Sequence, residues 1–112
     1  MKGTNIGEFE ELVLLVVIIL EDEAYVFKIQ EEIKKQVSRS ISMGALHTTL
    51  TRLEKKGFLN SEMTGASTKR GGRRKRVYQI TAHGTKVLQQ AKDVRSMLWD
   101  QLPTYALKMN HV

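Results

Sequence analysis

The sequence predicts a mainly α-helical domain that carries one small β-hairpin and ends in a separate C-terminal helix. Three observations support this fold class. Apolar residues recur at helical spacing in four stretches of the chain. Between the third and fourth stretches the period changes, and two short strand-like runs flank a loop rich in Gly and basic residues. The 112 residues correspond to one domain, and the 41% hydrophobic content is sufficient for a core.

The charge of the chain is unevenly distributed. The net charge is +6, yet residues 1–32 carry eight acidic and two basic side chains, whereas residues 33–92 carry fourteen Lys or Arg and two Glu. A basic middle on a small domain indicates a polyanionic partner, with nucleic acid as the first candidate. An anionic membrane surface fits less well, because large apolar residues do not interleave the basic stretch. The chain has no cysteine, which excludes disulfides and thiolate chemistry.

The first predicted helix covers residues 8–20. Glu residues in its first turn suit the helix dipole, and its length favours a helix over the β-strand that its Val and Ile content would also allow. Its apolar residues lie almost all round the helix, so it must be buried on every side. Because a small domain cannot do this alone, we expect part of the helix, including Leu12, Leu15 and Ile19, to face a second subunit. The apolar run is too short to span a membrane, and residues 1–20 lack the features of a signal peptide.

Two further helices, at about 24–37 and 42–57, are joined by a short turn and give a helix-turn-helix outline. In the second of them, leucines at helical spacing form the inward face, and Gly57 suits the C-cap. The outward face is small, hydroxylic and basic, which suits either an ordinary solvated surface or close contact with a DNA major groove. The residues that we expect to contact DNA, including the N-cap serine, are Ser42, Gly44, His47, Thr48, Thr51, Arg52 and Lys55.

A basic hairpin follows this helix. Strands are predicted at about 58–64 and 77–81, and the loop 65–76 between them has too few apolar residues to pack in a core. Such a basic run is often only a solvated or targeting-like segment. Its place in a hairpin directly after a groove-type helix favours a wing that contacts DNA. Its cationic residues are Lys69, Arg70, Arg73, Arg74, Lys75 and Arg76.

Thr81 suits the N-cap of the last predicted helix, which runs from Ala82 to about Leu102, where Pro103 stops it. A tail follows. The apolar positions of the helix alternate in steps of four and three, the spacing of a coiled-coil seam, and are Val87, Ala91, Val94 and Leu98. We expect this seam to form a dimer interface, which divides the chain into a DNA-binding unit, 1–81, and a dimerisation helix with tail, 82–112. Trp99 beside the seam is expected either in the dimer core or, with its symmetry mate, as a platform for a small planar aromatic effector.

These elements together give the outline of a winged helix-turn-helix, and several sequence blocks resemble the PadR-like family of transcriptional regulators. The blocks are GEFEELVLL (7–15), DEAY (22–25), GALHTTLTRLEKKG (44–57), RGGRRKRVY (70–78) and ITAHG (80–84). The resemblance covers Gly7 to about Leu102 and is closest to the short subgroup with a single C-terminal helix. It implies a homodimer that binds double-stranded DNA, usually a repressor, with the helix 42–57 in the major groove and the wing 65–76 on the backbone or minor groove. In several members small planar compounds bind near the dimer interface.

Two positions depart from the family pattern. His47 stands where the family usually has Tyr, a position that commonly touches the DNA backbone, so protonation of His47 would add pH dependence. Val26 stands where the second helix of the family often has Gly, which affects packing there.

From the predicted elements and the resemblance together, the main hypothesis is a cytoplasmic, homodimeric repressor that reads a pseudo-palindromic operator.

The sequence gives no indication of an enzyme. His47, His83 and His111 are scattered without Cys or acidic partners at ligand spacing, so neither a metal nor another cofactor is expected. Nucleophile elbows, P-loops and dinucleotide fingerprints are not found. The alternative from a different functional class is a protein-interaction module whose basic hairpin binds an acidic partner.

Overall fold

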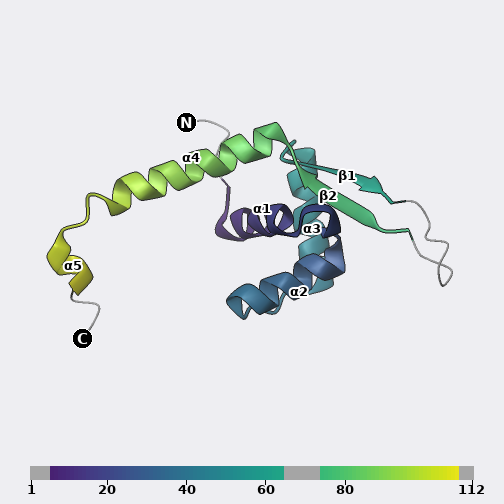
Figure 1. Cartoon of the computed structure of the whole chain (residues 1–112), viewed down its shortest axis with the longest axis horizontal. Coiled ribbons are helices and arrows are strands. Elements are labelled where there is room, and N and C mark those ends of the chain that lie inside the picture. Colours follow the sequence, from purple (N-terminus) through teal and green to yellow (C-terminus); the bar gives the residue numbers. More distant parts are fainter. Residues whose placement is uncertain (1–5, 65–73, 109–112) are drawn as a thin grey trace.

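The computed structural model describes residues 6–64 and 74–108 and has the predicted fold class, with a helix-rich body, one antiparallel hairpin and a projecting C-terminal helix (Figure 1). In chain order the elements are α1 (Glu8–Leu20), the 3-10 turn η1 (Glu21–Glu23), α2 (Val26–Val37), α3 (Met43–Lys55), β1 (Leu59–Met63), β2 (Arg76–Ile80), α4 (Ala82–Trp99) and α5 (Thr104–Lys108). The hairpin and the end of α4 lie on opposite sides of the body (Figure 1). This arrangement confirms the predicted winged helix-turn-helix.

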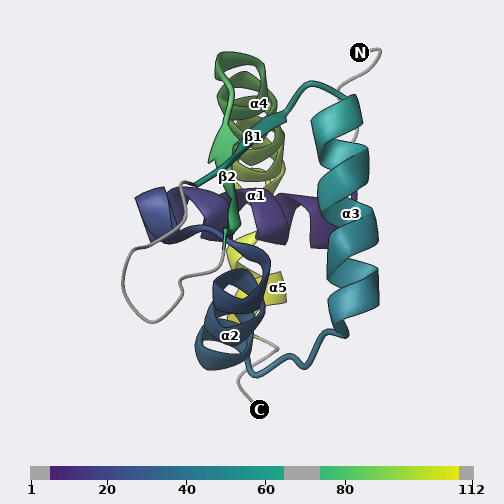
Figure 2. The ribbon, with the colours of Figure 1, turned by 90° about the vertical axis from the view of Figure 1, so that its right-hand side faces the viewer.

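Helix α1 is the centre of the core. It contacts α2, α3, α4 and β2, and Figure 2 shows it crossing behind α3. Val13, Leu14, Val16 and Val17 are buried, as a helix packed on several sides requires. Leu15 is exposed on the same helix, so the body covers only part of its apolar surface. The prediction that a monomer leaves some of this helix uncovered is confirmed.

Helix α3 has the two caps expected from the sequence. The Ser42 hydroxyl accepts the Ala45 N–H at 3.0 Å. At the other end, the Gly57 N–H donates to the Glu54 carbonyl and the Phe58 N–H to the Leu53 carbonyl, both at 3.0 Å. These two bonds form a Schellman motif, whose left-handed residue is Gly57 with φ +83°. The caps fix where α3 begins and ends, and so how far its outer face extends.

The hairpin pairs β1 with β2 in antiparallel register, from Leu59 opposite Ile80 to Met63 opposite Arg76. The middle of β2 is attached to the body, because the Tyr78 N–H donates to the Ala24 carbonyl at 2.9 Å. The predicted cations Lys69, Arg70 and Arg73 lie outside the described residues. The return strand begins one residue earlier than predicted, at Arg76.

Helix α4 starts on the body and then leaves it. The Thr81 hydroxyl accepts the Gly84 N–H at 2.9 Å, which confirms the predicted cap. Val87 and Leu88 are buried, whereas residues 94–99, the last of the helix, are exposed. The molecule measures 60 × 35 × 21 Å. The prediction of a helix to Leu102 followed by a tail is wrong: α4 ends at Trp99, and α5 follows Pro103. Proline suits the first turn of a helix as well as the end of the preceding one, because its φ is already helical.

The start of α2 also differs from the sequence expectation. The helix begins at Val26, two residues later than predicted, because residues 21–23 form the 3-10 turn. Tyr25 then takes the N-cap position in an extended conformation, with φ −109° and ψ 164°. Ile29 and Ile33 are fully buried, whereas Val37 at the end of the same helix is exposed.

Candidate nucleic-acid interface

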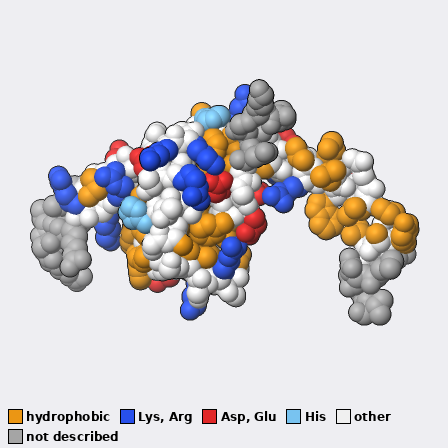
Figure 3. Space-filling model, turned by 180° about the vertical axis from the view of Figure 1, so that it is seen from behind, with side chains coloured by type: hydrophobic (Ala, Val, Ile, Leu, Met, Phe, Trp, Pro, Cys, Tyr) orange, Lys and Arg blue, Asp and Glu red, His pale blue; other side chains and the backbone are white. Residues whose placement is uncertain are grey.

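The outer face of α3 brings the predicted DNA-contacting residues together. Leu46, Leu50 and Leu53 are completely buried on the opposite side of the helix, and this fixes its rotation. A shallow groove of about 420 Å³ results on the outside, lined by His47, Thr48, Thr51, Arg52 and Lys55. Figure 3 shows this side of the molecule, with blue side chains gathered over α3. The surface offers hydroxyl donors and acceptors beside cations, which is the chemistry that contacts base edges and phosphates.

Gly44 lies exposed at the start of this face. A Cβ placed there would have no neighbour within 4 Å. The glycine therefore fills no packing role in the free protein. A residue without a side chain does allow another surface to approach the helix closely.

Arg52 is tied to the body of its own subunit. Its Nε donates to Glu10 Oε2 at 3.0 Å, and its Nη2 lies 3.5 Å from Thr49 Oγ1. Lys56 Nζ donates to the same oxygen of Glu10, also at 3.0 Å. The sequence predicted Arg52 as a DNA contact but gave no sign of its link to Glu10 or of the part of Lys56. The helical spacing showed that Arg52 points outward, but not that a carboxylate of α1 reaches it.

The Glu10 carboxylate is largely buried, with 11% of its side chain exposed. Burial raises the pKa of a carboxyl group, but here the Gly7 N–H bond at 2.9 Å and the Lys56 and Arg52 bonds outweigh it and lower the pKa of Glu10 below 4.5. Glu10 is therefore ionised at neutral pH. It neutralises part of the positive charge at the edge of α3.

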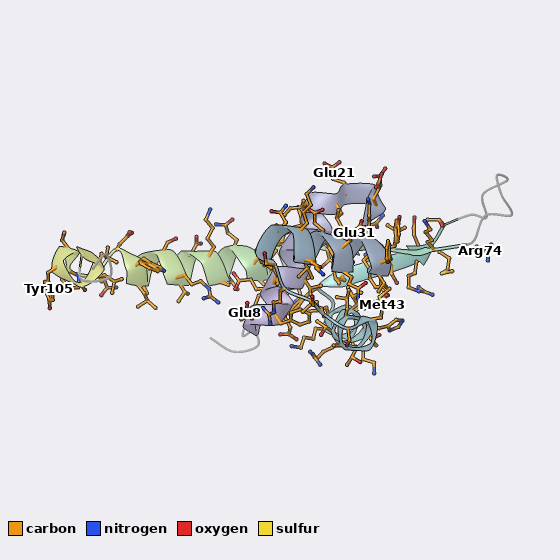
Figure 4. All side chains as sticks on the ribbon, turned by 90° about the horizontal axis from the view of Figure 1, so that it is seen from below. Glu8, Glu21, Glu31, Met43, Arg74 and Tyr105 are labelled. Carbon is orange, nitrogen blue, oxygen red and sulfur yellow. The ribbon has the colours of Figure 1, made fainter. Side chains whose placement is uncertain are left out.

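The three cations in the described part of the wing have different surroundings. Lys75 Nζ lies 4.1 Å from the centre of the Tyr25 ring, and Arg76 Nη1 donates to Ser61 Oγ at 2.9 Å. Arg74 is exposed and precedes β2. Figure 4 shows it at the opposite end of the molecule from Tyr105. A basic edge thus begins at the body and continues outward along the hairpin.

An aromatic and basic groove lies where the hairpin meets the start of α2. It has a volume of about 560 Å³ and is lined by Tyr25, Val26, Phe27, Arg74, Lys75 and Arg76. Phe27 is exposed to 55%. Sequence reasoning missed the two aromatic residues, because their contact with the wing is a long-range one that local patterns do not encode.

The predicted dimerisation residues divide into two groups. Leu15, Ile19, Val94 and Leu98 are exposed, and α1 and α4 are in contact. Ala91 is half-buried. Val87 belongs to the core of its own subunit, with 1% exposure, and Leu12 packs partly against that core. The seam available to a partner therefore starts after Val87, which corrects the sequence expectation.

Further apolar side chains extend this exposed surface beyond the predicted seam. Trp99 is exposed to 60% and Tyr105, in the unpredicted α5, to 68%. The others are Ile18, Met97, Leu102 and Leu107. An uncovered apolar surface of this extent is typical of a protein–protein interface.

Residues 6–64 and 74–108 contain no group of three His, Cys, Asp or Glu side chains that is placed to hold a metal ion. Within the same residues, every helix is too short or too polar to cross a membrane.

Comparison with known proteins gives a consistent result. Residues 14–90 match the model of the transcriptional regulator PadR-like family. A PadR-like transcription factor from Bacteroides fragilis has a similar structure, with a TM-score of 0.68, 25% identity, and coverage of 92% of this chain and 87% of that one. A PadR family regulator from Eggerthella lenta gives a TM-score of 0.65 at 26% identity, covering 83% and 80% of the two chains. A transcriptional regulator from Clostridium thermocellum gives 0.64 at 26%, covering 80% and 83%. A search of curated proteins found no match.

Proposed function

The chain belongs to the PadR-like family of transcriptional regulators, and we propose that it is a cytoplasmic, homodimeric repressor that binds a pseudo-palindromic DNA operator. One observation carries the proposal: the exposed hydroxylic and basic face of α3 lies on the same domain as a basic wing. Residues 1–81 form the DNA-binding unit, and residues 82–112 contribute the dimerisation helix.

Helix α3 enters the major groove and reads base edges through Thr48, Thr51 and Arg52. His47 and Lys55 lie at the borders of the same groove and contact the backbone. Gly44 allows close approach, and Ser42 with the free N–H groups at the start of α3 holds a phosphate. A two-fold dimer presents two such helices, so the half-sites are spaced by one turn of DNA, about 34–36 Å.

The wing binds the DNA backbone. Its six cations, of which Arg74, Lys75 and Arg76 are described, contact phosphates and carry no sequence information. Each phosphate contact contributes roughly 0.9 to the slope of log affinity against log salt. Replacement of Arg74 by Ala should therefore weaken binding to all sequences alike and flatten the slope by about this amount for each subunit.

The exposed apolar residues of α1 and α4 form the dimer interface. Their burial removes from water a surface that the monomer leaves uncovered. Trp99 and its symmetry mate lie at this interface as a platform on which a small planar aromatic effector stacks and releases the DNA. Its exposed ring in the single subunit is compatible with either this role or packing in the dimer core.

The decisive experiment measures binding to the DNA upstream of the protein's own gene and to a random duplex of equal length, at one salt concentration. The variants are Thr48→Ala, Thr51→Ala and Arg52→Ala. Each should reduce the ratio of operator to random affinity, and a lost bidentate base contact corresponds to about 1–3 kcal/mol. Thr85→Ala is the matched control, because its hydroxyl donates to the Thr81 carbonyl within α4. If all three variants keep the wild-type ratio, α3 is not the reader. If poly-glutamate binds the protein as well as DNA does, an acidic protein partner is favoured instead.

A further inference from the structure

Glu10 is unusual among the charged residues of the described chain. It is the only one that is buried, at 8% exposure, although it belongs to a first turn that also carries Glu8 and Glu11. Those two neighbours form ion pairs with Arg39 and Arg95. Only Glu10 reaches α3, where it binds two cations with one oxygen.

We propose that Glu10 is a positioning residue for sequence recognition: it orients Arg52 and withholds both Arg52 and Lys56 from phosphate contacts that any DNA sequence would offer. The proposal rests on the proposed function and concerns its selectivity. It assigns a role in recognition to a side chain of α1.

The Glu10 carboxylate is itself fixed in place. Oε1 accepts the Gly7 N–H at 2.9 Å, so the backbone at the start of α1 determines where Oε2 points. Oε2 then accepts Arg52 Nε and Lys56 Nζ, each at 3.0 Å. A carboxylate held on one oxygen can orient its partners through the other, because charge-assisted bonds are directional and strong.

The contacts to Arg52 leave its reading capacity largely intact. A guanidinium carries five N–H donors in one plane. Nε serves Glu10 and one Nη2 hydrogen points toward Thr49, so three donors remain for DNA, and their plane is already set. An arginine ordered before binding loses less conformational freedom on contact with a base than a mobile one does.

The same contacts restrain non-specific binding. A mobile Arg or Lys at the edge of a groove pairs with whichever phosphate lies nearest, whatever the sequence. With Glu10 in place, two cations share one anion, and the cluster carries one net positive charge instead of two. We therefore expect Glu10 to lower affinity for random DNA more than affinity for the operator.

The test compares Glu10→Gln with Glu8→Gln in the full-length protein. Glutamine keeps the length of the side chain and an acceptor for the Gly7 N–H but removes the charge. Glu8→Gln changes net charge equally, on the same turn, in a residue that pairs with the exposed Arg39 and not with α3. Fluorescence anisotropy with operator and random duplexes over a salt series gives the affinity ratio and the two salt slopes.

Glu10→Gln should steepen the random-DNA salt slope by about 0.9 to 1.8 for each subunit relative to Glu8→Gln, since one or two cations are released. The ratio of operator to random affinity should fall about fivefold or more, the lower range for loss of a base contact. In an Arg52→Ala background the Glu10 change should affect the ratio less, because only Lys56 is then released. Equal slopes and equal ratios for the two glutamine variants would overturn the proposal.

A second variant covers the case in which Glu10→Gln does not fold, as judged by circular dichroism. Glu10→Asp keeps the charge but is one methylene too short to bind Gly7 and Arg52 together, and it should shift slope and ratio in the same direction as Glu10→Gln.

The Arg52 Nε–H signal in ¹⁵N NMR, assigned with Arg52→Ala, gives a readout without DNA. Its hydrogen exchange should be slower in the wild type than in the Glu10 variants, and equal rates would overturn the proposal. A wild type that binds operator and random DNA equally would instead refute the proposed function.

Discussion

Replacement of Gly84 by Ala should destabilise the protein although the residue lies in a helix. A Cβ at this position would lie 2.3 Å from the Phe58 carbonyl oxygen, 2.8 Å from Ile80 Cδ1 and 3.1 Å from the Phe58 carbonyl carbon. The nearest atom is backbone and cannot rotate away. The Phe58 carbonyl also accepts the Thr81 N–H at 3.0 Å, so it is held at the junction between the hairpin and α4.

The magnitude follows from the displacement that the methyl group requires. Relief of a 2.3 Å contact requires a shift of about 1 Å between α4 and the backbone at Phe58, just before β1, and such overpacking costs about 1–3 kcal/mol. A weakened Thr81–Phe58 hydrogen bond adds about 1 kcal/mol. The better helix propensity of Ala offsets about 1 kcal/mol. We therefore expect the free energy of unfolding to fall by about 1–3 kcal/mol.

The assay is urea unfolding followed by circular dichroism at a fixed protein concentration, since the stability of a dimer depends on concentration. Gly44→Ala is the matched control, because it lies in the first turn of α3 with nothing within 4 Å of the added Cβ. It should raise the free energy of unfolding by about 0.5–1 kcal/mol. The same methyl group should weaken DNA binding if Gly44 faces the groove. A Gly84→Ala protein as stable as the wild type would refute the packing argument.

Two further predictions concern charge and assembly. The pKa of Glu10 is lowered in the folded state, so its ion pairs contribute stability at neutral pH that is lost as pH falls below 4.5 and through the folded pKa. The urea midpoint of the wild type should thus fall more between pH 7 and pH 3 than that of Glu10→Gln, and parallel losses would contradict this. Leu98→Glu places a charge on the exposed half of α4 and should convert the proposed dimer to a monomer of 12.8 kDa, as measured by light scattering. Lys92→Glu, on the same helix, should leave the proposed dimer intact. A dimer that survives Leu98→Glu would show that this half of α4 lies outside the interface.

The fold was predictable because its decisive signals are local. The leucine spacing of α3 identified its inward face, and the caps at Ser42 and Thr81 identified where α3 and α4 begin. Gly57 marked the end of α3 because the turn that ends a helix requires a positive φ at one residue, and this requirement involves only neighbouring residues. Boundaries shifted where a signal had two meanings, as with Pro103, which ends one helix and precedes another.

The candidate site was predictable only in part. Periodicity distinguishes the outward residues of α3 from the buried ones, but it treats all outward cations alike. Arg52 and Glu10 are 42 positions apart, and their ion pair depends on how α1 crosses α3. The contact of Lys75 with Tyr25 depends likewise on where the hairpin meets α2. Long-range pairs of this kind determine which cation is already engaged, and a single sequence does not contain that information.

Helix α1 connects the two functions proposed for this chain. Its first turn forms ion pairs with three other parts of the structure, through Glu8 to Arg39 before α3, through Glu10 to α3 and through Glu11 to Arg95 of α4 at 2.8 Å. Its later turns present the exposed Leu15 and Ile19 to the proposed partner subunit. One helix of 13 residues therefore carries both the carboxylate that binds Arg52 and apolar residues of the proposed dimer interface.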